Sequence, residues 1–137
     1  MRVALYGESA FAYYLVAGDA PSAVAPPSVL DKSCYPTQAT LDYVRERMPY
    51  LTRPVHCLVP KWERCSLDDV HLHGSSYPYR SGSFLRIDHG VIVPCPELCF
   101  LQLAQSLDLL FRALTAGTDF HRQLLFQRLY PCVDGMR

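Results

Sequence analysis

The clearest pattern of hydrophobic and polar positions lies between Pro96 and about Ala116. Apolar side chains recur there every three or four residues, at Phe100, Leu103, Ala104, Leu107, Leu110, Phe111 and Leu114. The polar side chains on the opposite side are Gln102, Gln105, Asp108 and Arg112. This period predicts a long amphipathic helix whose apolar face packs on the core of the domain. Pro96 suits the first helical position, and Gly117 suits the end.

Two shorter helices are predicted nearer the N-terminus. The first covers residues 9–17, with Ser9 as its N-cap and Gly18 at its end. The second covers residues 37–48, where Leu41, Val44 and Met48 share one side and Pro49 ends the helix. Residues 19–36 hold four prolines, which predicts an irregular connection over the surface or a mobile flap.

Short β-branched runs predict strands at residues 55–59, 70–73, 83–87 and 91–93. Arg2 to Tyr6 is either a further short strand or the lead-in to the first helix. The last two strands lie at hairpin distance around Asp88-His89-Gly90, which suits a tight turn with a bulge. The sequence therefore predicts one α+β domain at residues 1–117, with a small, mainly antiparallel sheet, followed by a helical tail at 118–137.

The composition is that of a globular protein, because half of the 137 residues are apolar and 19% are charged. The formal net charge is zero, which gives no electrostatic footprint for strong non-specific binding to nucleic acid. We find neither a signal peptide nor an apolar run long enough to span a bilayer. These features favour the cytoplasm, where cysteines stay reduced.

Six cysteines and two closely spaced histidines raise the question of a metal site. Its candidate ligands are Cys57, Cys65, His71 and His73. Two histidines two positions apart on a strand point to the same face, which permits chelation. The cysteine spacings are irregular, however, and zinc sites normally have tighter Cys-x(2–4)-Cys pairs. Buried, inert thiols are therefore the favoured interpretation, and we assign no metal ligand from the sequence.

Cys95 has the strongest case for reactivity among the cysteines. It directly precedes Pro96, and a helix N-terminus lowers the pKa of a thiol there. His71 or His89 would serve as the base only if the fold brought one of them close. A single feature of this kind does not make a catalytic residue, and we assign none.

Residues 93–104, Val-Pro-Cys-Pro-Glu-Leu-Cys-Phe-Leu-Gln-Leu-Ala, resemble the strand-to-helix junction of a group of actinobacterial proteins related to the AbiEi-type antitoxins. That junction typically reads valine, two serines, then Pro-Glu-Leu-x-Phe-Leu-Gln-x-Ala. Weaker matches at residues 53–59, 70–73 and 82–87 extend the resemblance over roughly residues 5–117. The resemblance implies an N-terminal, antitoxin-like module of a bacterial protein.

Proteins of that group often carry a Vsr-like segment with a restriction-endonuclease fold. Such a nuclease needs a Glu-x-Lys or Asp-x-Lys pair, but Leu30 and Val59 precede Lys32 and Lys61 by two positions. Phosphate loops, serine nucleophile elbows and His-Glu-x-x-His helices are also missing. Residues 118–137 and the Pro94-Cys95 pair depart from the group's pattern as well. We therefore expect no enzyme activity and no cofactor, and we expect a truncated copy of a longer nuclease-like protein.

Two classes of function follow from the sequence. The first is a non-enzymatic interaction or regulatory module that binds a protein or DNA through Tyr77, Tyr79, Arg80 and Arg86, where aromatic rings offer stacking surfaces. The 100–114 helix face also fits a two-heptad seam and hence a homodimer, although core packing is favoured. The alternative is a metal-dependent hydrolase or zinc-binding domain built from His56, His71, His73 and nearby cysteines.

Overall fold

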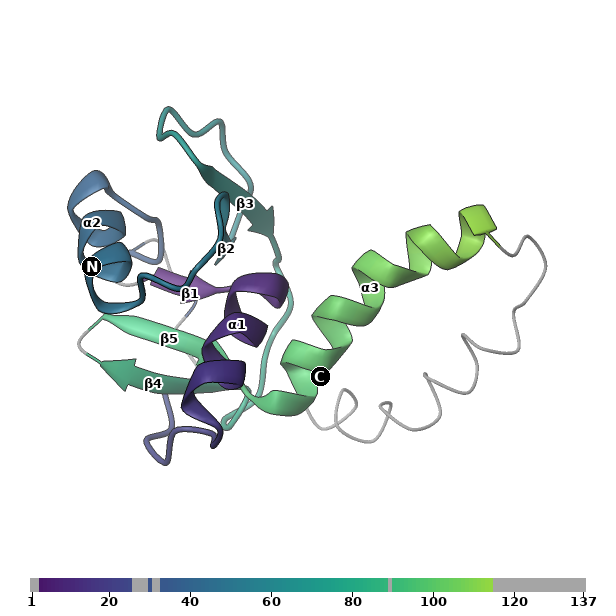
Figure 1. The fold of residues 1–137 in the computed structure, drawn as a ribbon, viewed down its shortest axis with the longest axis horizontal. Helices are drawn as coiled ribbons and strands as arrows, with labels where there is room; N and C mark the ends of the chain where they lie inside the picture. Colours follow the sequence, from purple (N-terminus) through teal and green to yellow (C-terminus); the bar gives the residue numbers. More distant parts are fainter. Residues whose placement is uncertain (1–2, 26–29, 31–32, 89, 115–137) are drawn as a thin grey trace.

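The computed structural model describes residues 3–25, 30, 33–88 and 90–114. The helices and strands among them are, in chain order, β1 (Val3–Leu5), α1 (Gly7–Ala17), α2 (Gln38–Arg47), β2 (Val55–Val59), β3 (Val70–Gly74), β4 (Phe84–Asp88), β5 (Val91–Pro94) and α3 (Pro96–Leu114) (Figure 1). The predictions for His89, for the end of the last helix and for the tail at 118–137 lie outside these residues. The predicted α+β class is confirmed.

The five strands form a mixed sheet in the order β3-β2-β1-β5-β4. β1 pairs antiparallel with β2 but parallel with β5, and β2 pairs parallel with β3. The prediction of a mainly antiparallel sheet is therefore wrong. Two of the four pairings are parallel, β1 with β5 and β2 with β3. Val3–Leu5, which is too short to be assigned firmly from sequence, forms the central strand, with every side chain fully buried.

The hairpin predicted around Asp88-His89-Gly90 is confirmed for its two strands. β4 and β5 pair antiparallel, with a register shift between Arg86 and Asp88, and Gly90 has a φ of 77°. The connection after α1 lies along the free edge of β4. There the Ala25 amide donates to the Phe84 carbonyl and the Arg86 amide donates to the Ala23 carbonyl. Part of the predicted irregular connection thus covers an edge of the sheet.

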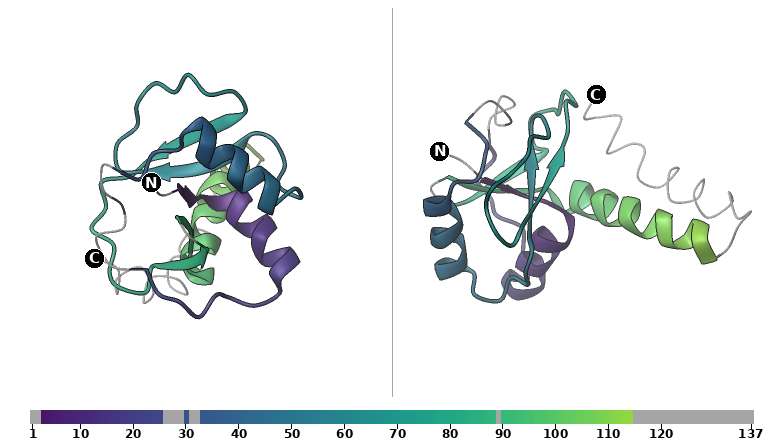
Figure 2. Two further views of the ribbon diagram at one scale, coloured as in Figure 1. Left: turned by 90° about the vertical axis from the view of Figure 1, so that its left-hand side faces the viewer. Right: turned by 90° about the horizontal axis from the view of Figure 1, so that it is seen from above.

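Helices α1 and α2 lie on the same side of the sheet (Figure 2). α2 begins as predicted, since the Thr37 hydroxyl accepts a hydrogen bond from the Thr40 amide at 3.2 Å. α1 begins earlier than predicted, at Gly7, and its N-cap residue is Tyr6. Ser9 does not cap the helix, because its hydroxyl instead accepts the His56 amide of β2 at 2.8 Å. The predicted end at Gly18 is confirmed by its φ of 81°.

Helix α3 leads away from the end of β5 (Figure 1), and its first turns pack against α1. In its first two turns the fully buried positions differ from the predicted ones, although Leu103 of the predicted face packs half-buried against the core. Leu98, Cys99 and Gln102 are buried, whereas the Phe100 side chain is 52% exposed. Gln102 is buried because its Oε1 accepts the Gly7 amide at 2.9 Å, at the start of α1. The predicted apolar positions from Leu107 to Leu114 belong to residues 106–114, whose side chains lie outside the description.

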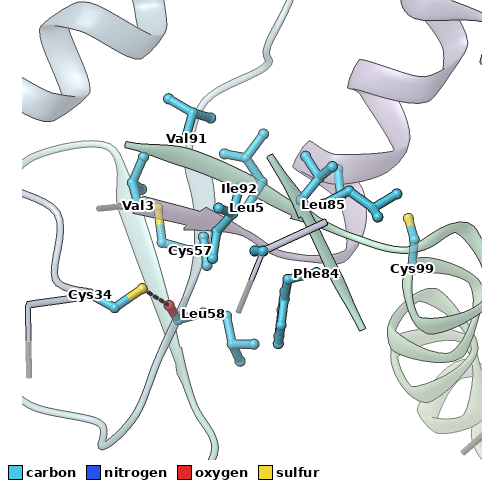
Figure 3. Packing of buried hydrophobic residues seen from close by; sticks show 14 of the residues in the cluster. Val3, Leu5, Cys34, Cys57, Leu58, Phe84, Leu85, Val91, Ile92 and Cys99 are labelled. Carbon is cyan, nitrogen blue, oxygen red and sulfur yellow. Dashed lines mark hydrogen bonds between the residues drawn. The ribbon is translucent and has the colours of Figure 1, made fainter. Parts of the chain in front are cut away.

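The core is formed by aliphatic side chains from the central strands together with buried cysteines. Figure 3 shows Cys57 beside Val3 and Cys34, and the Cys34 thiol donates to the Leu58 carbonyl at 4.0 Å. Cys34, Cys57, Cys95 and Cys99 are all buried, as the interpretation of inert core thiols predicted. Among the described residues, no helix has the length and apolarity needed to cross a membrane.

Candidate metal centre

Strands β2 and β3 place three histidines on one face of the sheet. In their parallel register His56 lies beside His71, and Leu58 lies beside His73. Because side chains alternate between the two faces of a strand, His71 and His73 share a face, and the pairing adds His56 to it. β3 is the edge strand of the sheet, so the cluster lies at the sheet's border.

The ring nitrogens of these histidines are close enough to share one ion. One nitrogen from each of the three rings lies within 4.8 Å of those from the other two, and His56 Nδ1 lies 2.9 Å from His73 Nε2. Tetrahedral zinc, with zinc–nitrogen bonds of about 2.0–2.1 Å, holds its nitrogen ligands about 3.3 Å apart. We call this group the three-histidine cluster. Its rings are stacked, with centroids 4.5–5.1 Å apart and planes inclined by 13–30°, so binding one ion would require the rings to turn until their lone pairs meet.

Two residues from the start of α1 adjoin the three-histidine cluster. The ring of Tyr6 stacks on His73 with centroids 3.8 Å apart and planes inclined by 14°. The Tyr6 hydroxyl donates to Gln105 Oε1 of α3 at 3.3 Å. Glu8 places its Oε2 atom 3.3 Å from His56 Nε2. The cluster is therefore supported by an aromatic ring on one histidine and by a carboxylate on another.

Burial keeps two of the imidazoles neutral. Burial, together with the smaller effects of the neighbouring His71 and His56, lowers the pKa of His73 to about 4. Burial also lowers the pKa of His56, an effect that the Glu8 carboxylate opposes and His71 reinforces. A neutral imidazole is the form that binds a metal ion. At neutral pH both rings are thus already in the ligand form.

The cluster is also open to solvent. His71 is exposed, while His56 and His73 are half-buried. Three protein nitrogens leave at least one position of a tetrahedral ion free, which is the arrangement of catalytic rather than closed structural zinc sites. The geometry is therefore suited to an ion that takes up a further ligand from solution.

The four candidate ligands chosen from sequence do not come together as a set. His71 and His73 join His56, but Cys57 points to the opposite face of β2 and lies in the core (Figure 3). Burial raises the pKa of the Cys57 thiol to about 12. The half-buried Cys65 accepts the Leu67 amide at 3.4 Å and is not part of the three-histidine cluster. His56 was recognised only in the enzyme alternative, because its register with β3 is not visible in the sequence.

Cys95 is not activated. It does lie directly before α3, yet burial raises the pKa of its thiol to about 11, outweighing the amide hydrogen bond from Leu98 that lowers it. The predicted lowering of its pKa is therefore wrong in direction. The structure does not group His71 with Cys95, and His89 lies outside the described residues.

The proposed partner surface is only partly available. Tyr77, Arg80 and Arg86 are exposed. Tyr79 is half-buried, since its ring packs edge-on against Phe84 at 5.0 Å and its hydroxyl pairs with Ser75 Oγ at 2.9 Å. Tyr79 therefore contributes to the packing of the domain.

The chain matches no protein-family model, no curated protein and no solved structure. Its function therefore has to be inferred from the chemistry of its own residues.

Proposed function

We propose that this chain is a metal-binding protein that holds a zinc-class divalent ion with His56, His71 and His73. The observation that carries the proposal is the convergence of three ring nitrogens, all within 4.8 Å of one another, on two paired strands. The lowered pKa values of His56 and His73 support it, because no proton has to be removed from either ring at neutral pH.

The donor set favours some metals over others. Three imidazoles without a thiolate suit Zn²⁺, Cu²⁺ or Ni²⁺, whereas Ca²⁺ and Mg²⁺ require oxygen ligands. Zinc is the first ion to test, because imidazole is one of its usual ligands and three ring nitrogens lie within 4.8 Å of one another. When bound, such an ion supplies Lewis acidity to whatever occupies its free position. A hydrolytic role, the alternative drawn from the sequence, would use this property.

Metal binding is tested by titrating chelator-treated protein with zinc and by measuring bound metal by mass spectrometry. We expect one zinc per chain, and we expect each of the variants His56→Ala, His71→Ala and His73→Ala to weaken binding at least tenfold. Ser76→Ala, at an exposed position after β3, is the control and should bind as the parent does. Absence of stoichiometric zinc, or affinity unchanged in all three histidine variants, would overturn the proposal.

A second candidate function is that of a protein-interaction module. Large apolar side chains are exposed on two helices that contact each other, namely Phe11, Leu15 and Val16 on α1 and Phe100 on α3. Such side chains are typical of protein-binding surfaces when they gather on neighbouring elements. This candidate accords with the resemblance to antitoxin-related proteins and with a homodimer through the 100–114 helix face. The neutral net charge favours a protein partner over DNA.

Sedimentation equilibrium tests this second candidate without knowledge of the partner. A homodimer through α3 should dissociate in Phe100→Glu, while Glu46→Ala on the exposed side of α2 should leave the mass unchanged. A monomeric parent protein would exclude the homodimer. A gel shift with duplex DNA at low salt tests the remaining alternative, since electrostatic binding is strongest there.

A further inference from the structure

We infer that Glu8 is a positioning residue of the metal site, holding His56 so that His56 binds the ion through Nδ1. The inference rests on the proposed function. Its basis is that both ring nitrogens of His56 are engaged, on opposite sides of the ring. Nε2 lies 3.3 Å from the Glu8 carboxylate, and Nδ1 lies 2.9 Å from His73.

The tautomer of His56 follows from this geometry. The Glu8 carboxylate lies at ion-pair distance from Nε2, and its negative charge favours the tautomer in which that nitrogen carries the proton of the neutral ring. The other nitrogen, Nδ1, is then left with its lone pair directed at His73. The charge of Glu8 thus favours the tautomer in which the lone pair faces the interior of the three-histidine cluster.

Glu8 lies outside the set of direct ligands for the same reason. The two nitrogens of an imidazole point away from each other, so a carboxylate bound to Nε2 is separated from an ion bound to Nδ1 by the width of the ring. Carboxylates in this position fix ring orientation and raise the basicity of the ligand. Because Glu8 is 62% exposed, its contribution comes from geometry rather than from a strong ion pair.

The first turn of α1 holds the carboxylate in place. The backbone of His56 is bound to this turn on both sides, through its amide to Ser9 Oγ at 2.8 Å and its carbonyl to the Tyr6 amide at 2.9 Å. Gly7 is in turn held by Gln102 of α3 at 2.9 Å. Glu8 therefore projects from a segment fixed to both β2 and α3, as a positioning residue requires.

The experiment compares Glu8→Ala and Glu8→Gln with the full-length parent chain. Loss of such a carboxylate typically weakens metal binding about 10–100-fold, and we expect Glu8→Ala to raise the Kd for zinc by this factor. Glu8→Gln keeps an oxygen that accepts from Nε2–H, so its loss should be smaller. Glu46→Ala removes the same charge from α2 and should leave the Kd unchanged. Circular dichroism verifies that each variant is folded.

A second readout reports on the tautomer itself. Two-bond ¹H–¹⁵N NMR spectra of the metal-free parent should show His56 protonated at Nε2, and Glu8→Ala should give a mixture of tautomers. A parent protein that binds zinc but has His56 protonated at Nδ1, or that binds equally well after Glu8→Ala, would overturn this inference and leave the metal-binding function intact. A parent protein that binds no zinc would overturn both.

Discussion

His56 Nδ1 and His73 Nε2 lie 2.9 Å apart, although the two residues belong to different strands and are separated by 17 positions. Parallel pairing of β2 with β3 produces this contact, because it sets His73 beside Leu58 and His71 beside His56. The two imidazoles form a hydrogen bond with each other. An ion bound by both rings would replace that hydrogen bond with two coordinate bonds.

Replacing His73 with phenylalanine should separate metal binding from folding. The phenyl ring can keep the stacking on Tyr6 but has no nitrogen to offer an ion. We expect zinc at 100 times its Kd to stabilise the parent by about 2.7 kcal/mol and to leave His73→Phe unchanged. Thermal unfolding with and without zinc measures the difference. A zinc-dependent rise in Tm of His73→Phe equal to that of the parent would contradict the assignment of His73.

The metal-free protein should lose stability in mild acid. The pKa of His73 falls from 6.5 to about 4 on folding, and the pKa of His56 is also lowered. The unfolded chain therefore binds more protons than the folded chain between these pH values, so stability falls as the pH drops from about 6.5 towards 4. Urea unfolding of chelator-treated protein across this range provides the measurement, and His73→Phe should show a shallower dependence.

Cys95 should be unreactive in the folded protein at pH 8. Burial raises the pKa of its thiol to about 11, so very little of it is thiolate at that pH. Mass spectrometry after iodoacetamide treatment should find Cys95 modified only when the protein is unfolded in denaturant. The half-buried Cys65 serves as an internal comparison. Rapid labelling of Cys95 in the native protein would instead point to an accessible nucleophile.

The core-facing side of α3 can be tested with a pair of substitutions. Leu98 is buried, so Leu98→Ala should cost about 2–4 kcal/mol of unfolding free energy. Phe100 is more than half exposed, so Phe100→Ala should cost less than about 1 kcal/mol. Urea denaturation of a monomeric sample measures both. A larger loss of stability in Phe100→Ala than in Leu98→Ala would show that the face predicted from the hydrophobic period is the buried one.

The hydrogen bond from the Gly7 amide to Gln102 should contribute to the stability of the fold. In Gln102→Leu the Gly7 amide loses its acceptor, which should cost about 1–3 kcal/mol because a backbone donor is left unpaired. Gln105 is exposed, and Gln105→Leu should change stability by no more than about 0.5 kcal/mol. Equal stability of the two variants would show that the buried hydrogen bond contributes nothing.

Local sequence features were sufficient to predict several elements. Thr37 carries the side-chain chemistry of an N-cap and is one, and Gly18 ends α1 in a conformation that favours glycine. The β-branched runs predicted β2 to β5, and the turn residues around Asp88 predicted the hairpin of β4 and β5. Each of these features is determined by residues close together in the sequence, so it can be predicted without knowledge of the tertiary fold.

Features that depend on distant partners were missed or only partly found. β1 has three residues and becomes central only because β2 and β5 flank it. The burial of Gln102 depends on an amide 95 positions away. The three-histidine cluster depends on the register of β2 with β3, so the sequence pairs His71 with His73 but does not place His56 beside them.

The three-histidine cluster joins an edge strand, β3, to the inner strand β2. Among the described strands, β3 pairs with β2 only, and the three histidines lie across that pairing. Edge strands open more readily than central ones, and their amides exchange with solvent during such local opening. An ion bound across β2 and β3 would cross-link an edge strand to its neighbour. Zinc should therefore slow amide exchange in β3 far more than in β5. The metal would then stabilise one edge strand against local opening more than it stabilises the whole domain.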